Sequence, residues 1–370
     1  AFKKCAVTSV NLANVQYIGA NAFGGAALSS VNLSAAIEIG DKAFGNSFLK
    51  EATVPANSGL RYIGAEVFRG CTELDPSAVL NNATLLEYIG DYAFYKVGSA
   101  LALQQQSLNI PVTVKYIGES AFRDASLYGG LNIYGARGSV LESIGAHAFR
   151  GTKIAGRVSV PSTVKSIGDY AFAELKGIDE LFFATGSALE YIGHDAFYAS
   201  GISGDLIIPD SVTFIGNMAF ASCTRLKSVY IGAGVVELGS KAFSMAGISE
   251  VNFSDNSSLD TIGSEAFKQC GNLLKITIPA TVTRIDRRAF AYARALTEVT
   301  MSGGVPPALG VSVFYGTESL NVIYVPAGKN EKGFPFINVY SLPTPTNVPD
   351  GSFRDGMSRW ADYVNLLKVK

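Results

Sequence analysis

The chain has 370 residues, of which 48% are apolar and 16% are charged, a composition typical of an ordered protein rather than a disordered tether. Its 30 basic and 31 acidic residues give a net charge of −1, and the sequence shows no basic stripe, which argues against nucleic-acid binding. No run reaches the roughly 18 apolar residues that a membrane-spanning helix needs. The length alone would suggest two or three domains.

A short motif, Ile-Gly-x-x-Ala-Phe, recurs from one end of the chain to the other, for example at 18–23, 39–44, 89–94, 215–220 and 262–267. Its phenylalanines follow one another at intervals of 21 to 28 residues, a period that predicts a solenoid in which each repeat contacts only its neighbours. Because a solenoid can lengthen without needing a new core, this period favours one solenoid over the two or three domains that the length suggests. The predicted core phenylalanines are Phe23, Phe44, Phe68, Phe94, Phe122, Phe149, Phe172, Phe197, Phe220, Phe243, Phe267 and Phe290, with Phe314 in a degenerate copy.

The repeat at 262–285 shows how one rung of the solenoid is built. Residues 274–278 alternate apolar and polar side chains, which predicts a strand with one buried face, and Pro279 ends it. Residues 264–268 are predicted to form a short helical or 3-10 turn on the opposite side, and Gly263 to allow a close backbone approach. We therefore expect an α/β-type solenoid of about 13 rungs, with a parallel β-sheet on one face and short helical turns on the other.

The four cysteines, Cys5, Cys71, Cys223 and Cys270, each follow a repeat phenylalanine by three residues. They therefore share one column, but never in adjacent rungs. Two rungs separate Cα atoms by about 10 Å at the spacing of strands in a sheet, whereas a disulfide tolerates about 7 Å. We expect buried, unpaired thiols and neither disulfides nor a metal site.

The full repeat, Ile-Gly-x-x-Ala-Phe-x-x-Cys-x-x-Leu-x-x-Ile-x-Ile-Pro, resembles the BspA-like leucine-rich repeats of mostly bacterial cell-surface proteins, over residues 1–326. The resemblance implies a right-handed leucine-rich repeat coil in an exported protein, often lipid- or wall-anchored and associated with adhesion. It implies no catalytic residues and no cofactor. Because the chain starts within a repeat, we expect its export signal to lie outside this sequence.

Residues 327–370 depart from the repeat register. We expect an irregular segment followed by a helical stretch that caps the last rung with the only tryptophan, Trp360. Three repeats are longer than the rest, with extra residues near 81–82, 104–106 and 134–138, where loops with or without a function are possible.

On each predicted strand, the residue between the two inward aliphatic residues faces outward. This column is mostly small and polar, but three consecutive rungs present Phe182, Ile207 and Tyr230, with Glu180 and Asp205 beside them. Contiguous exposed apolar groups mark interaction sites, so these five residues form the candidate binding patch. Strand propensity alone is the alternative explanation for the three apolar residues.

Catalytic motifs are absent from the sequence: His-Glu-x-x-His, Cys-x-x-Cys, Gly-x-Ser-x-Gly and the phosphate loop do not occur. The two histidines, His147 and His194, lie in repeat turns and are expected to be solvated. We predict a non-catalytic, monomeric surface or secreted protein that binds host or microbial proteins or glycans. The alternative is a structural or assembly scaffold without a dedicated ligand.

Overall fold

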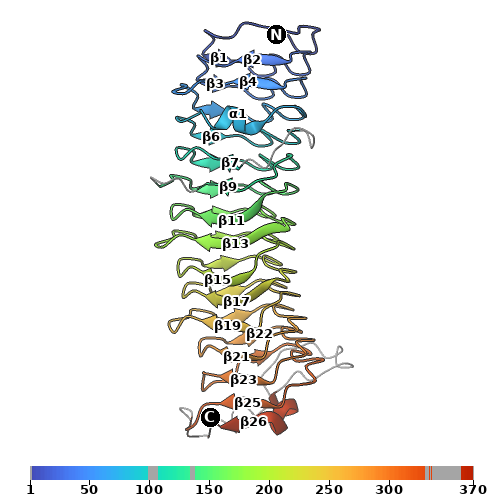
Figure 1. Ribbon diagram of the computed structural model, residues 1–370. Coiled ribbons are helices and arrows are strands. Elements are labelled where there is room, and N and C mark those ends of the chain that lie inside the picture. The colour runs from blue at the N-terminus through green and yellow to red at the C-terminus, as the bar shows by residue number, and fades with distance from the viewer. Residues whose placement is uncertain are drawn as a thin grey trace. The chain divides into compact units, whose positions relative to one another are not determined.

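The computed structural model describes residues 2–98, 107–133, 138–329, 333, 335 and 360–369. It consists of two compact units, Ala1–Leu189 and Glu190–Lys370. Each unit is a parallel β-solenoid, and the two together contain about 13 turns, as the repeat period predicts (Figure 1).

The first unit has two rows of strands, one on each side of its core. One row consists of two-residue strands that pair in parallel: β1 (Tyr17–Ile18), β3 (Glu38–Ile39), β5 (Tyr62–Ile63), β6 (Tyr88–Ile89), β8 (Tyr116–Ile117), β10 (Ser143–Ile144) and β12 (Ser166–Ile167). The other row begins with the pair β2 (Ser30–Asn32) and β4 (Glu51–Thr53). It continues in a second sheet with β7 (Leu108–Asn109), β9 (Leu131–Asn132), β11 (Ala155–Val160) and β13 (Gly177–Phe183).

The second unit repeats this arrangement. Its row of short strands contains β14 (Tyr191–Ile192), β16 (Phe214–Ile215), β18 (Glu237–Leu238), β20 (Thr261–Ile262), β22 (Arg284–Ile285) and β24 (Ala308–Leu309). Its other row is a seven-stranded parallel sheet in the order β15 (Gly204–Ile208), β17 (Leu226–Ile231), β19 (Glu250–Phe253), β21 (Lys275–Ile278), β23 (Glu298–Met301), β25 (Val322–Val325) and β26 (Leu367–Val369).

A column of stacked phenylalanine rings runs through the core of each unit. In the first unit, the rings of Phe94 and Phe122 have centroids 5.2 Å apart and are almost parallel. In the second unit, Phe220 and Phe243 are 5.3 Å apart in the same arrangement, and both side chains are fully buried. A single rung has nothing to bury its phenylalanine against, so stacking is what gives each ring its apolar surroundings.

The segment that contains Ala-Phe is a series of turns, and the predicted helical face is wrong. Glu265 and Gln269, on either side of Phe267, both have a left-handed backbone with φ 59°. The N–H of Ala266 closes a turn onto Gly263 O, whereas the N–H of Phe267 donates to Ala289 O in the next rung at 2.8 Å. The left-handed residues interrupt any helix, and they direct backbone N–H groups toward the neighbouring rung.

Helical structure within the described residues is confined to two short segments. One is α1 (Pro76–Leu80), capped by the side chain of Asp75, which begins within the first of the three long repeats. The extra residues near 81–82 follow it directly, and the Asn82 side chain donates to Val54 O. Residues 104–106 and 134–137 lie outside the described part of the chain.

The other helical segment is a 3-10 helix, η2 (Trp360–Leu366), near the C-terminus. Trp360 is fully buried, and its Nε1 donates to Pro307 O at 2.8 Å. The ring of Tyr363 meets Phe314 edge-on at 5.5 Å. Strand β26 follows and pairs in parallel with β25. The assignment of residues 327–370 as a cap stays a prediction.

The glycine of the repeat motif lies against the backbone of the preceding rung. A Cβ on Gly263 would be 2.3 Å from Leu238 O, which confirms the predicted close approach. A Cβ on Gly216 would lie 2.5 Å from both Gly193 C and His194 N. Rigid backbone atoms on the other side cannot move aside as a flexible side chain would.

We therefore expect Gly216→Ala to lower the free energy of unfolding by about 1–3 kcal/mol, the usual cost of forced overpacking. The control is Gly271→Ala, because a Cβ there would meet nothing within 4 Å. This control should leave the free energy of unfolding unchanged or raise it by about 0.4–1 kcal/mol, because alanine reduces the conformational entropy of the unfolded chain. Chemical denaturation of both variants measures the difference, and equal stabilities would contradict the close-approach argument.

Candidate functional site

The seven-stranded sheet of the second unit presents one column of outward side chains. Strand register places Ile207 opposite Tyr230, and Tyr230 opposite Asn252. Further along, Thr277 lies opposite Thr300, and Thr300 opposite Tyr324. The alternation of buried and exposed residues along each strand turns the larger aliphatic neighbours inward and leaves this column facing solvent.

Two adjacent members of this column are apolar and exposed. Ile207 is 64% exposed and Tyr230 is 37% exposed. Beside them, Ser228 donates a hydrogen bond from Oγ to Asp205 Oδ1 at 2.7 Å, which holds that carboxylate next to the pair. Because Ile207 and Tyr230 are register partners on neighbouring strands, they form a small exposed apolar surface with a polar edge.

A groove of about 430 Å³ begins at the next strand of the same sheet. The Asn252 amide donates to Glu250 Oε1 at 2.9 Å, and Lys275 lies 2.9 Å from Glu298 Oε2. The hydrogen bond that Lys275 donates to Glu298, together with the negative charge of Glu298, raises the pKa of Lys275, which stays protonated. The polar residues that line the groove are Glu250, Asn252, Ser254, Asp255, Ser257, Lys275, Thr277, Thr281 and Ser302.

The groove and the apolar pair together offer complementary chemistry on one face. Carboxylate, amide and hydroxyl groups can hydrogen-bond the hydroxyls of a sugar or the backbone of a peptide. The apolar surface of Ile207 and Tyr230 can pack against a ring or a side chain. Sequence reasoning identified Ile207, Tyr230 and Asp205 but missed the groove, because Ser254 and Asp255 lie in the turn that follows a strand rather than in the outward column.

The other two residues of the predicted patch belong to the first unit, on β13. Phe182 is 40% exposed, and the guanidinium of Arg157 lies over its ring, 4.6 Å from the centroid. Arg157 is also 3.7 Å from Glu180 Oε1. Phe182 is therefore partly covered by a paired cation.

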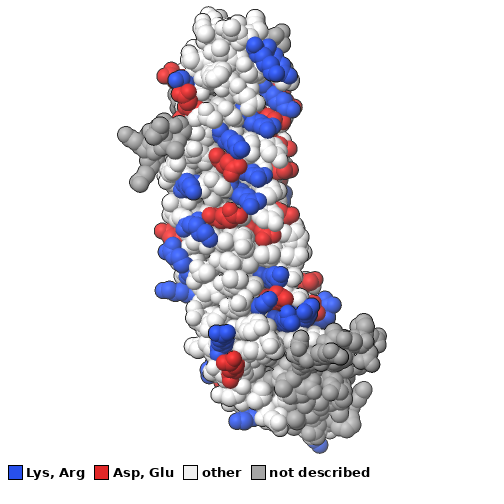
Figure 2. Space-filling model, turned by 90° about the vertical axis from the view of Figure 1, so that its right-hand side faces the viewer, with Lys and Arg blue, Asp and Glu red and all other residues white. Residues whose placement is uncertain are grey.

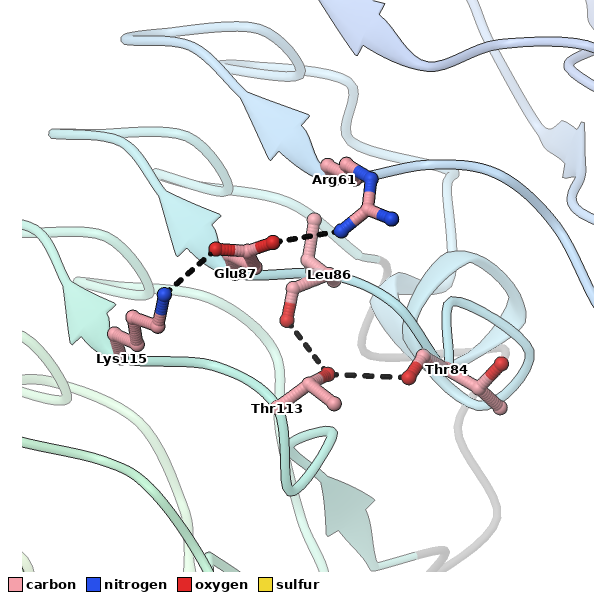
Figure 3. Close-up of polar contacts among 6 residues, drawn as sticks. All are labelled: Arg61, Thr84, Leu86, Glu87, Thr113 and Lys115. Carbon is pink, nitrogen blue, oxygen red and sulfur yellow. Dashed lines mark hydrogen bonds and ion pairs between the residues drawn. The ribbon is translucent and has the colours of Figure 1, made fainter.

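The first unit has two exposed columns that the sequence analysis did not single out. Tyr62, Tyr88 and Tyr116 occupy matching positions in β5, β6 and β8, and the first two rings stack at 4.7 Å. Figure 3 shows the neighbouring column, where Glu87 lies 2.7 Å from Arg61 and 2.8 Å from Lys115. The Glu87 carboxylate accepts hydrogen bonds from Lys115 and Arg61, which lower its pKa, the one from Lys115 having the larger effect. The recurring Tyr-Ile-Gly was a visible signal for the first column.

Within the described residues, no three His, Cys, Asp or Glu side chains gather in an arrangement that could hold a metal ion. Both histidines, predicted to be solvated, are half-buried. The His147 ring stacks on Tyr170 at 4.8 Å, and burial together with nearby arginines lowers its pKa. His194 Nδ1 accepts a hydrogen bond from the Asn217 N–H.

The four cysteines form no disulfide with one another. Cys71, Cys223 and Cys270 are buried as predicted, but Cys5 is half-exposed, against the prediction. Ser47, which occupies the same position one rung before Cys71, has its Oγ 3.4 Å from Cys71 Sγ, and this contact shows that the column exists. Burial raises the pKa of Cys71 to about 11 and that of Cys270 to about 12. Such thiols are inert, because the thiolate is the reactive species.

The comparisons with known proteins agree with this architecture. A family model described as BspA type leucine rich repeat region (6 copies) matches residues 1–128, 100–224, 142–258 and 225–334. None of the curated proteins compared with the chain matches it. In the described part of the chain, no helix has both the length and the apolar character needed to cross a bilayer.

Solved structures of bacterial leucine-rich repeat proteins are similar to the chain. One from Bacteroides ovatus ATCC 8483 is 26% identical with a TM-score of 0.57, over 81% of this chain and 79% of that one. A leucine rich cell surface protein from Faecalibacterium prausnitzii A2-165 is 24% identical with a TM-score of 0.43, over 84% and 83%. The pneumococcal vaccine antigen PcpA is 19% identical with a TM-score of 0.34, over 65% and 73%.

The environment of the thiols leads to a test with a thiol reagent. At pH 8 in the native protein, we expect Cys5, which is half-exposed, to react quickly and the other three cysteines to react only as the chain unfolds. All four should react at once in denaturant. Absorbance from a chromogenic disulfide reagent, followed over time, counts the reacting thiols. Fast reaction of more than one thiol in the native state would contradict the buried column.

Proposed function

Because the chain belongs to the BspA type leucine-rich repeat family, we propose that it is a non-catalytic binding protein, displayed at the cell surface or secreted, that binds a host or microbial protein or glycan. The family and the fold are those of repeat scaffold proteins, which are generally non-enzymatic. The location follows from the export and surface anchoring that the family resemblance implies.

One observation supports the binding role most directly: an exposed apolar pair adjoins a polar groove on a single sheet. Ile207 and Tyr230 are next to each other, and Tyr230 is in register with Asn252 at the groove. Interfaces combine an apolar centre with a rim of hydrogen-bonding groups, and tyrosine is frequent at their energetic centre. The proposed contact surface thus consists of Ile207, Tyr230 and Asp205 with the groove. Phe182 and Glu180, on the first unit, are proposed as further contact residues.

The parallel sheet explains how such a surface can be specific. Successive strands are about 4.8 Å apart, so the column offers one side chain to the ligand at each step. A rigid backbone fixes these positions before binding, which lowers the entropy lost on association. An extended polymer, such as a glycan or a peptide strand, matches a surface with this regular spacing.

The test is a binding screen of the purified chain against a panel of extracellular-matrix proteins and a glycan array. The test variant is Ile207→Ser/Tyr230→Ser, and Phe182→Ser is measured separately. We expect saturable binding that weakens at least tenfold in the double variant, because the apolar centre of the contact is removed.

The matched control is Val236→Ser/Leu274→Ser. It also removes two exposed apolar side chains of the second unit, 48% and 54% exposed, that lie outside the outward column. It should bind like the wild type. Equal loss in both double variants, with unchanged melting temperatures, would contradict the site. A chain that binds no probe but self-associates in light scattering would favour the scaffold alternative.

A further inference from the structure

A hollow of about 230 Å³ lies on the first unit, at the turns formed by the residues that directly follow the repeat phenylalanine in each rung. The residue directly after the phenylalanine is Lys3, Gly24, Gly45 and Arg69 in four successive rungs. Backbone bonds from Lys4 N to Gly24 O and from Gly25 N to Gly45 O confirm that these rungs are adjacent. The two middle rungs therefore have no side chain at a position that is filled in the rungs before and after them.

No side chain projects from Gly24, Gly25 or Gly45 at this part of the surface, and neighbouring atoms lie close to these glycines. A Cβ on Gly25 would be 3.3 Å from the side chain of Lys4, and one on Gly45 would be 3.1 Å from Glu66 O. Gly25 has a left-handed backbone, with φ 68°, as do Lys4 and Asn46 at the same position of the neighbouring rungs. The hollow is thus a consequence of the sequence at these rungs, and its floor is backbone.

The rim of the hollow has a surplus of positive charge. Four cationic side chains and one anionic side chain line it, which leaves three uncompensated positive charges: Lys3, Lys4, Lys42 and Arg69 against Glu66. Within the described residues, Lys3 and Lys4 have no carboxylate within 4 Å. The net charge of −1 for the whole chain conceals this local excess. Figure 2 shows Lys and Arg side chains following one another along the upper part of the face that it presents.

Glu66 holds two of these cations in place. Its carboxylate is 3.1 Å from Lys42 Nζ and is hydrogen-bonded to Arg69. Partial burial would raise the pKa of Glu66, but the bonds from Arg69 and Lys42 outweigh burial and lower it, so the group is ionised. The Arg69 guanidinium also lies 5.5 Å from the centre of the Tyr95 ring. Lysine has three N–H donors and arginine has five, so both retain donors for a ligand.

We propose that this hollow binds a sulfate or phosphate group, either free in solution or as an ester on a glycan. Arg69 and Lys42 supply fixed charge-assisted donors on one side, and Lys3 and Lys4 close over the group from the other. The amides of Asn21 and Asn46, which also line the hollow, complete the set of donors. This site lies on the first unit and is independent of the proposed contact surface.

The experiment uses the full chain and three probes: inorganic sulfate, a heparin-derived oligosaccharide, and the same oligosaccharide after desulfation. Isothermal titration calorimetry at low and physiological salt measures each affinity. We expect one saturable site for a sulfated probe, and binding at least tenfold weaker for the desulfated oligosaccharide. Binding of inorganic sulfate assigns the site to the free anion, whereas binding of the sulfated oligosaccharide alone assigns it to an esterified glycan.

The variant Lys3→Gln/Lys4→Gln should weaken binding at least tenfold, because it removes the unpaired charges without disturbing Glu66. The control Lys153→Gln/Lys227→Gln changes the net charge equally at exposed positions outside the hollow, and it should bind within twofold of the wild type. Equal weakening in both variants, or no binding of either sulfated probe by the wild type, would overturn the proposal. Both double variants replace exposed side chains, so unchanged melting temperatures are expected and checked.

Discussion

The structure depends on the close, regular approach of one rung's backbone to the next. Phe267 N–H bonds to Ala289 O across rungs, and Gly263 lies where any side chain would meet Leu238 O. Both features require the same distance between neighbouring rungs. The stacked phenylalanine rings match this distance, because their centroids are 5.2–5.8 Å apart. Backbone pairing, glycine placement and ring stacking thus reinforce one another, because a change in spacing would disturb all three.

Fixed spacing makes the column, rather than the single residue, the unit in which surface chemistry is organised. A hydrophobic pair arises when two successive rungs place apolar residues at the outward position, as Ile207 and Tyr230 do. A hollow arises when two successive rungs place glycine where neighbours have lysine or arginine. Neither feature requires a change of fold, so one scaffold can present very different surfaces along its length.

The sequence predicted the solenoid, the buried phenylalanines and the burial of Cys71, Cys223 and Cys270, because each depends on a residue that recurs at a fixed place in the repeat. It failed on the helical face, since Glu265 and Gln269 have no side-chain feature that indicates a left-handed backbone. It failed to find the groove at Asn252 and the hollow at Gly45, because both depend on turns that bring residues of different repeats together. The cap and the Phe182 contact stay predictions.

The charged column of the first unit has a consequence for how such arrays can grow. Charges alternate along it, with Glu87 between Arg61 and Lys115, and Glu142 3.1 Å from Lys165. Loss of the one rung that contains Glu87 would set Arg61 beside Lys115, and like charges directly opposite each other on neighbouring strands are destabilising. Loss or gain of two rungs would preserve the alternation. Between Arg61 and Lys165, unequal recombination would therefore keep the charges matched only when it inserts or deletes repeats in pairs.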